Sequence, residues 1–193
     1  MIYQEKIFTK EECERIIDFK NIYTDLPYRT REKHIDFDNH RIDQIVKIKG
    51  KKKFGKFFNV WDIKNDSDSE WMFFKLTNWF SKISGIELTE DKIIGSSLHK
   101  YSKGDLFMRH RDISTLFVER RWNLGIQLNS DYVGGDYMCY INNDTFTFDK
   151  TEGTALAYVA DIEHEITEII EGERWSLVLT ILKENIKEKR KLF

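Results

Sequence analysis

Two apolar patterns with helical spacing occur in the first ninety residues. Thr9, followed three residues later by Glu12, forms the capping-box signature of a helix N-terminus. Apolar side chains then recur at roughly helical spacing, at Cys13, Ile16, Ile17 and Phe19. This pattern predicts a first helix from about Lys10 to Lys20.

The second of these apolar patterns is the clearer one and predicts a second helix. Ser67 and Glu70 repeat the capping-box spacing, and Gly85 supplies a helix terminator. The apolar positions between them are Met72, Leu76, Trp79 and Ile83. Methionine and aromatic side chains at this spacing could line a cofactor pocket, but packing against a sheet is far more common. We therefore interpret both helices as outer braces of a sheet.

The texture changes beyond Asp91 to short runs of β-branched and aromatic residues separated by glycine or acidic turns. The expected strands are IIGSSLHKY, WNLGIQL, DYMCYI, TFTF, TALAYV, HEITEII and RWSLVLTIL. Short strands without helices between them favour an antiparallel sandwich or barrel over a βαβ sheet. The predicted fold class is mainly β with flanking α-helices (α+β).

Composition narrows the class of protein. The 31 basic and 33 acidic residues nearly cancel, so no overall field favours a nucleic acid or a membrane as partner. Cys13 and Cys139 lie far apart without CxxC spacing, which indicates neither a disulfide framework nor a structural zinc site. The charged opening stretch does not resemble a signal peptide, and no run is apolar enough to span a bilayer, so we expect a cytoplasmic protein. The oligomeric state has no signal in the sequence.

The domain organisation has no visible break. We expect one domain over residues 1–193, in which 1–90 supply supporting helices and early strands and 91–193 form the core. The segment KIKGKKKFGKFF, residues 47 to 58, packs lysines between phenylalanines. It could be a flap over a site or a patch for an acidic partner, but a solvated loop is the commoner use of such a run.

The stretch FMRHRDIST, residues 107 to 115, carries His110 and Asp112 two positions apart. A kinase catalytic loop would need asparagine at position 117, which is Phe117, and no Gly-rich phosphate loop occurs. On a strand, residues two apart share a face, so both side chains can converge on one metal ion. Two polar residues on an exposed strand remain the alternative.

A third ligand would have to come from elsewhere in the chain. Two histidines and a carboxylate on one face of an octahedron suit non-haem Fe(II) oxygenases, because they leave positions open for substrate and oxygen. His164, at the start of a late expected strand, is the best candidate. His34 and His40 lie in a polar segment, and His99 is too close in sequence to the first pair.

Arg174 follows His164 by ten residues, across an expected turn at Glu171, Gly172 and Glu173. The turn would bring the guanidinium back to the same mouth of the barrel. There it could bind the carboxylate of a dicarboxylate cosubstrate. The alternative is a surface ion pair with Glu171 or Glu173.

Three stretches together resemble a known family. They are LHKYSKGDLFMRHRD, then RRWNLGIQLNSDYVGGDY, then GTALAYVADIEHEITEIIEGERWSLVLTIL. Their order and spacing are similar to those of the 2-oxoglutarate and Fe(II)-dependent dioxygenases, in the branch that includes the prolyl 4-hydroxylases. The resemblance covers about the last hundred residues well and implies a double-stranded β-helix, the jelly roll of cupin-like proteins.

The resemblance also implies a site. Fe(II) would be held by His110, Asp112 and His164, and Arg174 would bind the distal carboxylate of 2-oxoglutarate, with O2 as the second cosubstrate. Tyr101 matches a tyrosine of the cosubstrate pocket. By strand alternation Gln127 and Asn123 would face the same cavity, although a buried strand amide is as often structural. Gly134 and Gly135 match a double glycine that turns between strands.

The implied activity is hydroxylation of an unactivated C–H bond with release of succinate and CO2. A peptidyl prolyl residue is one expected substrate; a free amino acid, another small molecule or a nucleobase is the alternative. Phe107 and Thr180 stand where prolyl hydroxylases often carry a tyrosine and an aromatic residue, which argues against proline. A second hypothesis, of a different functional class, is a jelly-roll module that binds a partner and catalyses no reaction.

Overall fold

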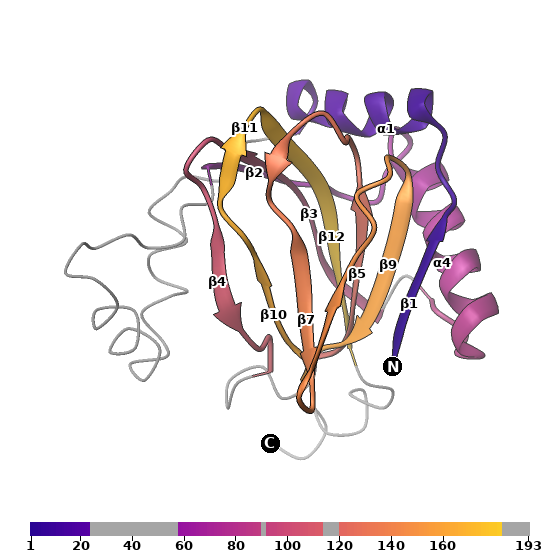
Figure 1. The fold of residues 1–193 in the computed structure, drawn as a ribbon. Helices are drawn as coiled ribbons and strands as arrows, with labels where there is room; N and C mark the ends of the chain where they lie inside the picture. The colour runs from indigo at the N-terminus through magenta and orange to yellow at the C-terminus, as the bar shows by residue number, and fades with distance from the viewer. Residues whose placement is uncertain (24–57, 90–91, 114–119, 183–193) are drawn as a thin grey trace, which may run out of the picture.

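Antiparallel strands make up most of the chain. The computed structural model describes residues 1–23, 58–89, 92–113 and 120–182. Six strands form a large sheet in the order β1-β9-β5-β12-β3-β2, four form a small sheet in the order β4-β10-β7-β8, and β11 pairs with β6. The two larger sheets face each other (Figure 1). This arrangement confirms the predicted double-stranded β-helix with flanking helices.

The bounds of the strands agree with most of the predicted runs. The large sheet consists of β1 (Ile2–Lys6), β2 (Phe58–Asp62), β3 (Ile93–Ser102), β5 (Arg120–Gln127), β9 (Thr154–Val159) and β12 (Glu173–Leu182). The small sheet consists of β4 (Phe107–His110), β7 (Tyr137–Ile141), β8 (Asp144–Thr147) and β10 (Glu163–Ile166). The additional pair is β6 (Val133–Gly134) and β11 (Ile169–Glu171).

The helices cover the outer face of the large sheet. The helical segments are α1 (Lys10–Ile17), the 3-10 turn η1 (Asp18–Asn21) and α4 (Glu70–Ser84). Buried α4 side chains such as Met72 and Leu76 share one apolar cluster with sheet residues such as Leu124 and Leu177. Both helices therefore act as braces, as their apolar stripes predict. None of the described helices is both long and apolar enough to span a bilayer.

The helix ends bear out one capping prediction and overturn another. Thr9 and Glu12 form the reciprocal capping box at the start of α1. At α4 the N-cap is Ser69, not Ser67, because the backbone first makes a turn in which Asp66 accepts from the amides of Ser69 and Glu70. The Ser69 hydroxyl donates to the Lys64 carbonyl and makes no capping bond to the helix. Gly85 ends α4 in the left-handed conformation, as predicted.

Four strands, β1, β2, β4 and the two-residue β6, lie outside the predicted runs, and one expected strand is divided. The run HEITEII splits into β10 and β11, which belong to different sheets. The missed strands β1, β2 and β4 are edge strands of four or five residues. Short edge strands carry charges and little apolar alternation, so periodicity gives them a weak signal.

Alternation along β12 places polar groups between the two sheets. Trp175, Leu177 and Leu179 face the helices as part of the large apolar cluster. Arg174 and Ser176, which are also buried, therefore point the other way, into the space between the sheets. The interior of the jelly roll is consequently polar at the positions where a site was predicted.

Candidate metal centre

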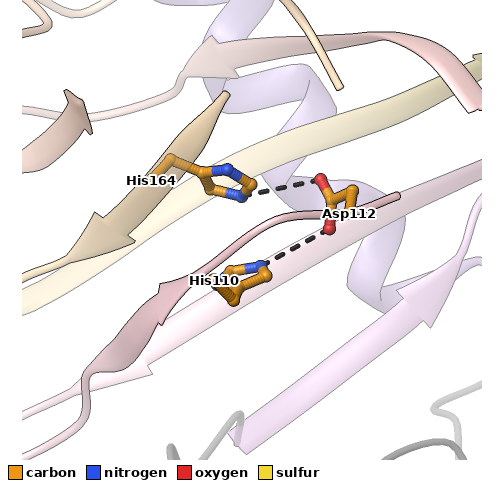
Figure 2. Close-up of side chains that lie close together, drawn as sticks. All are labelled: His110, Asp112 and His164. Atoms are coloured by element: carbon orange, nitrogen blue, oxygen red, sulfur yellow. Dashed lines mark ion pairs between the residues drawn. The ribbon is translucent and has the colours of Figure 1, made fainter. Parts of the chain in front are cut away.

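Three predicted ligands meet at one point between the sheets. His110 ends β4, His164 lies on β10 directly opposite it, and Asp112 follows the end of β4. The Nε2 atoms of His110 and His164 lie 3.4 Å and 3.5 Å from the two carboxylate oxygens of Asp112 (Figure 2). Strand alternation predicts Asp112 on the same strand face as His110. Asp112 instead lies in a bend beyond the strand, where its amide donates to the Ala160 carbonyl.

Both imidazoles are held in the tautomer that a metal requires. Nδ1 of His110 lies 2.7 Å from the Met108 carbonyl oxygen, and Nδ1 of His164 lies 3.0 Å from the Ile162 carbonyl oxygen. A carbonyl can only accept, so each Nδ1 carries the proton and donates. Each Nε2 then carries the lone pair that a metal ion would bind, and faces Asp112.

Aromatic rings fix the orientation of the two imidazoles. The Phe107 ring centroid lies 3.8 Å from that of His110. The Tyr137 ring is nearly parallel to His164, with the centroids 5.8 Å apart and 4° between the planes. These contacts restrict ring rotation, so the Nε2 atoms stay directed at the same point.

Asp112 is kept ionised and is oriented by two side chains. Burial by itself raises the pKa of this carboxyl, but the neighbouring His110 and His164 side chains and the Arg120 cation outweigh it, and the pKa lies well below its ordinary range. The Asn123 amide donates to Oδ2, and Arg120 Nη1 lies 3.6 Å from Oδ1. A carboxylate with this orientation is a ready metal ligand.

The set fits a divalent ion such as Fe(II). Cis ligands about 2.1 Å from a metal lie about 3 Å apart, close to the spacing seen here. The ligand atoms of His110, Asp112 and His164 all lie within 4.8 Å of one another. The buried Nε2 of His110 has no hydrogen-bond partner, which is costly unless another group uses its lone pair. A metal ion would satisfy it.

Arg174 lies in the same interior and is 1% exposed. Its Nη1 donates to the Ser176 hydroxyl at 2.9 Å and its Nη2 to the Gln127 side-chain oxygen at 3.0 Å, while Nε is buried without a partner. No carboxylate in the described part of the chain pairs with it. The alternative of a surface ion pair is wrong, because Glu173 points outward and pairs with Lys100 at 2.5 Å.

A small cavity connects the guanidinium with the residues around the metal ligands. Arg174, Ser176, Asn123, Tyr137 and Tyr158 are among the residues that line it. Burial raises the pKa values of Tyr137 and Tyr158 well above their ordinary value, so both hydroxyls stay protonated. Apart from the Arg174 guanidinium, none of the residues that line the cavity carries a charge.

The other predicted pocket residues also lie here, with contacts that refine their roles. Tyr101 is buried, and its ring centroid lies 5.5 Å from the Arg174 guanidinium carbon. Gln127 accepts from Arg174 and donates to the Asn129 carbonyl and the Tyr132 hydroxyl, so it anchors the arginine. Asn123 contacts Asp112 instead of Arg174.

Residues that sequence reasoning missed include Ser176, Arg120, Tyr137 and Tyr158. Ser176 lies two positions from Arg174 on one strand, so alternation alone could have placed it on the same face. The other three come from strands whose register the sequence does not reveal. His34, His40 and the lysine-rich segment 47–56 lie outside the described residues.

The double glycine does more than turn the chain. Gly135 has a φ of +62°, and a Cβ there would lie 2.4 Å from Ile169 Cδ1 and 3.3 Å from Arg174 Cδ. A larger residue would therefore press on the arginine. The glycine allows the chain after β6 to lie close against Ile169 of β11 and the Arg174 side chain.

Comparison with known sequences gives limited information. No family model matches the chain. Over 90 residues, 46% of this chain, the sequence is 33% identical to an uncharacterized protein of fowlpox virus (strain NVSL). The matched stretch spans only 21% of the length of that viral protein.

Comparison with solved structures is decisive for the fold. A 2OG-Fe(II) oxygenase family oxidoreductase from Burkholderia pseudomallei aligns with a TM-score of 0.67 at 16% identity, over 95% of this chain and 85% of the other. The fold is that of the 2-oxoglutarate and Fe(II) oxygenases. A Pseudomonas putida prolyl-4-hydroxylase aligns with a TM-score of 0.62 at 13% identity, over 95% of this chain and 93% of the other. A Trichoplax adhaerens prolyl hydroxylase, in complex with a hypoxia inducible factor peptide fragment, aligns with a TM-score of 0.65 at 13% identity. The alignment covers 99% of this chain and 86% of the other.

Proposed function

We propose that the protein is a non-haem Fe(II)- and 2-oxoglutarate-dependent oxygenase. The observation that carries the proposal is Arg174, a buried guanidinium without a carboxylate partner among the described residues, in the same interior as His110, Asp112 and His164. Burying an unpaired charge is unfavourable, so such a residue is retained where a ligand completes the pair. The oxygenase fold supports the same conclusion.

The ligand set would hold Fe(II) through the two Nε2 atoms and the Asp112 carboxylate. Bound there with 2-oxoglutarate and O2, the iron would supply oxidation of an unactivated C–H bond, with release of succinate and CO2. Asn123 holds the carboxylate in place by donating to Oδ2. Arg174 and Ser176 would bind the distal carboxylate of 2-oxoglutarate. The hydroxyls of Tyr137 and Tyr158 are hydrogen-bonded to each other, so one of the two would be left to donate a hydrogen bond into the cavity.

For the substrate, we propose a protein side chain, with a peptidyl prolyl residue as the first candidate. The Trichoplax enzyme, which shares this fold, is described in complex with a peptide fragment. The Phe107 ring lies against His110 and supplies an apolar wall next to the candidate metal centre, which suits an apolar side chain in general, whereas the missing tyrosine hydroxyl counts against proline in particular.

A small polar molecule, such as a free amino acid or a nucleobase, is the second candidate. It is favoured by Thr180, which lies opposite Asn123 between β12 and β5. A hydroxyl near the residue that orients Asp112 suits a substrate that makes hydrogen bonds better than a proline ring.

Succinate release tests the proposal. Purified protein with Fe(II), ascorbate, 2-oxoglutarate and air should form succinate slowly alone and faster with a true substrate, which permits a screen of proline-containing peptides against amino acids and nucleosides. Asp112→Asn and Arg174→Ala should abolish the signal. Asp161→Asn, which removes an exposed carboxylate near His164, is the matched control and should retain it. Succinate formation at equal rates in wild type and Asp112→Asn would refute the assigned site.

A further inference from the structure

A group of charged and aromatic side chains lies on the outer face of the small sheet, behind the metal ligands. The Arg109 guanidinium donates to one oxygen of Glu163 from Nε at 3.1 Å and from Nη2 at 2.5 Å. The same guanidinium carbon lies 3.7 Å from the centroid of the Tyr140 ring. The Tyr140 hydroxyl donates to Glu165 at 2.5 Å. We call Arg109, Tyr140, Glu163 and Glu165 the outer clamp.

The outer clamp links three neighbouring strands. Arg109 comes from β4, Glu163 and Glu165 from β10, and Tyr140 from β7. Tyr140 and Glu163 are direct cross-strand partners. Arg111 adds a second cation, with Nε 3.8 Å from the other oxygen of Glu163. The interaction is therefore a network and not an isolated exposed pair, which is the case in which surface charges contribute measurably.

The position of the outer clamp in the sequence connects it to the metal ligands. His110 stands between Arg109 and Arg111, and His164 stands between Glu163 and Glu165. Because adjacent strand residues point to opposite faces, the same backbone segments carry the ligands inward and the outer clamp outward. A shift of β4 along β10 would move both sets together.

Backbone pairing holds β4 weakly in register, and Phe107 is its apolar contact with the interior. β4 is a four-residue edge strand, and β10 is its only strand partner in the described part of the chain. The aligned pairs are His164 with His110 and Ile166 with Phe107, and the register is irregular between them. Weakly specified registers slip unless side chains fix them.

We propose that the outer clamp is a positioning device that holds β4 on β10 and so keeps His110 and His164 at metal-binding distance. This inference rests on the proposed function, because it assumes that the two histidines bind a metal ion. The clamp residues do not touch the metal; they act through the backbone of the ligands. Loss of the clamp should lower metal affinity more than it lowers the stability of the fold.

Metal affinity of full-length variants tests the proposal. We would measure Mn(II) binding by isothermal titration calorimetry for wild type, Arg109→Gln, Glu163→Gln and the double variant. Each single change should weaken binding about threefold to tenfold, and the double variant should be no weaker than the worse single variant. Arg109→Lys, which keeps the charge next to Glu163, should restore part of the affinity.

Lys75→Gln is the matched control. Lys75 is also a partly exposed cation that pairs with a carboxylate, Glu12, at 2.6 Å and lies over an aromatic ring, Phe8, but on the helical side of the molecule. Its loss should lower the melting temperature about as much as Arg109→Gln and leave Mn(II) affinity within about twofold of wild type. Hydrogen exchange of the metal-free protein should quicken over residues 107–112 in Arg109→Gln and not in Lys75→Gln.

The outcomes separate the two proposals. If wild type binds Mn(II) and Arg109→Gln binds it equally well, the clamp has no positioning role and the oxygenase site stands. If wild type binds no Mn(II), or binds it no more tightly than His110→Ala does, the proposed function fails and the clamp inference fails with it. Weaker binding in both clamp variants with unchanged binding in Lys75→Gln supports the inference.

Discussion

Replacing Arg174 by methionine should separate stability from cosubstrate binding. Methionine keeps most of the volume of the side chain and removes the charge. In the metal-free protein Arg174 has two hydrogen-bond partners, Ser176 and Gln127, and no carboxylate among the described residues. The variant therefore loses little that stabilises the fold, and loses the group that we assign to the distal carboxylate of 2-oxoglutarate.

The effect of Arg174→Met on the free energy of unfolding should be small, because two opposing contributions nearly cancel. Two hydrogen bonds from a charged donor contribute about 1.5–3 kcal/mol each, and burying the ion costs several kcal/mol, so the two effects nearly cancel. We expect the free energy of unfolding to change by no more than about 1 kcal/mol, which is about 2–4 °C in the melting temperature of a chain of this size. Breaking a buried ion pair would instead cost about 3–5 kcal/mol.

Cosubstrate affinity should fall far more. Removing one partner of a buried, hydrogen-bonded charge pair costs about 2–5 kcal/mol, which corresponds to a loss of about 30-fold to several thousand-fold in affinity. Thermal unfolding followed by circular dichroism and anaerobic calorimetry of 2-oxoglutarate with Mn(II)-loaded protein measure the two quantities. Arg121→Met, at an exposed position on β5, is the control and should change neither. A large drop in melting temperature with unchanged 2-oxoglutarate affinity would show that Arg174 is structural.

Three further predictions concern the ligand set and its surroundings. Asn123→Leu removes the donor to Asp112 and should weaken Mn(II) binding about tenfold in calorimetry; unchanged affinity would remove its positioning role. Gly135→Ala should destabilise the fold by about 1–3 kcal/mol in thermal unfolding, because φ is positive and the new Cβ would crowd Ile169, whereas Gly95→Ala, with no atom within 4 Å of the new Cβ, should not. Because the pKa of Asp112 is lowered in the folded state, its contribution to stability is present above the ordinary carboxyl pKa and is lost as pH falls through the lowered value. Metal-free wild type should therefore lose more stability than Asp112→Asn between about pH 5 and about pH 2, and equal losses in thermal melts would contradict the assignment.

The sequence predicts the elements with strong periodicity and the chemistry with distinctive residue types. The α4 stripe and the strands β5 and β12 can be predicted because each is rich in buried apolar residues. His110, Asp112, His164 and Arg174 could be proposed from residue type, order and spacing. The structure brings all of them to one interior, while their roles stay predictions.

The remaining features depend on register, which a single sequence does not contain. The contact of Asn123 with Asp112 joins β5 to a bend after β4, and nothing local indicates that these segments meet. The choice between an ion pair and a ligand-binding role for Arg174 depends on which face of β12 the side chain lies on. Glu173 faces outward to Lys100, so the adjacent Arg174 faces inward. The outer clamp likewise exists only because β4, β10 and β7 are neighbours in one sheet.

Anaerobic visible absorption tests the central claim most directly. Fe(II) and then 2-oxoglutarate would be added to wild type, His110→Ala and Arg174→Ala. We expect a charge-transfer band that appears in wild type when both are present, is absent in His110→Ala and requires more 2-oxoglutarate in Arg174→Ala. A folded wild-type protein that shows no band at any concentration of either component would contradict the central claim.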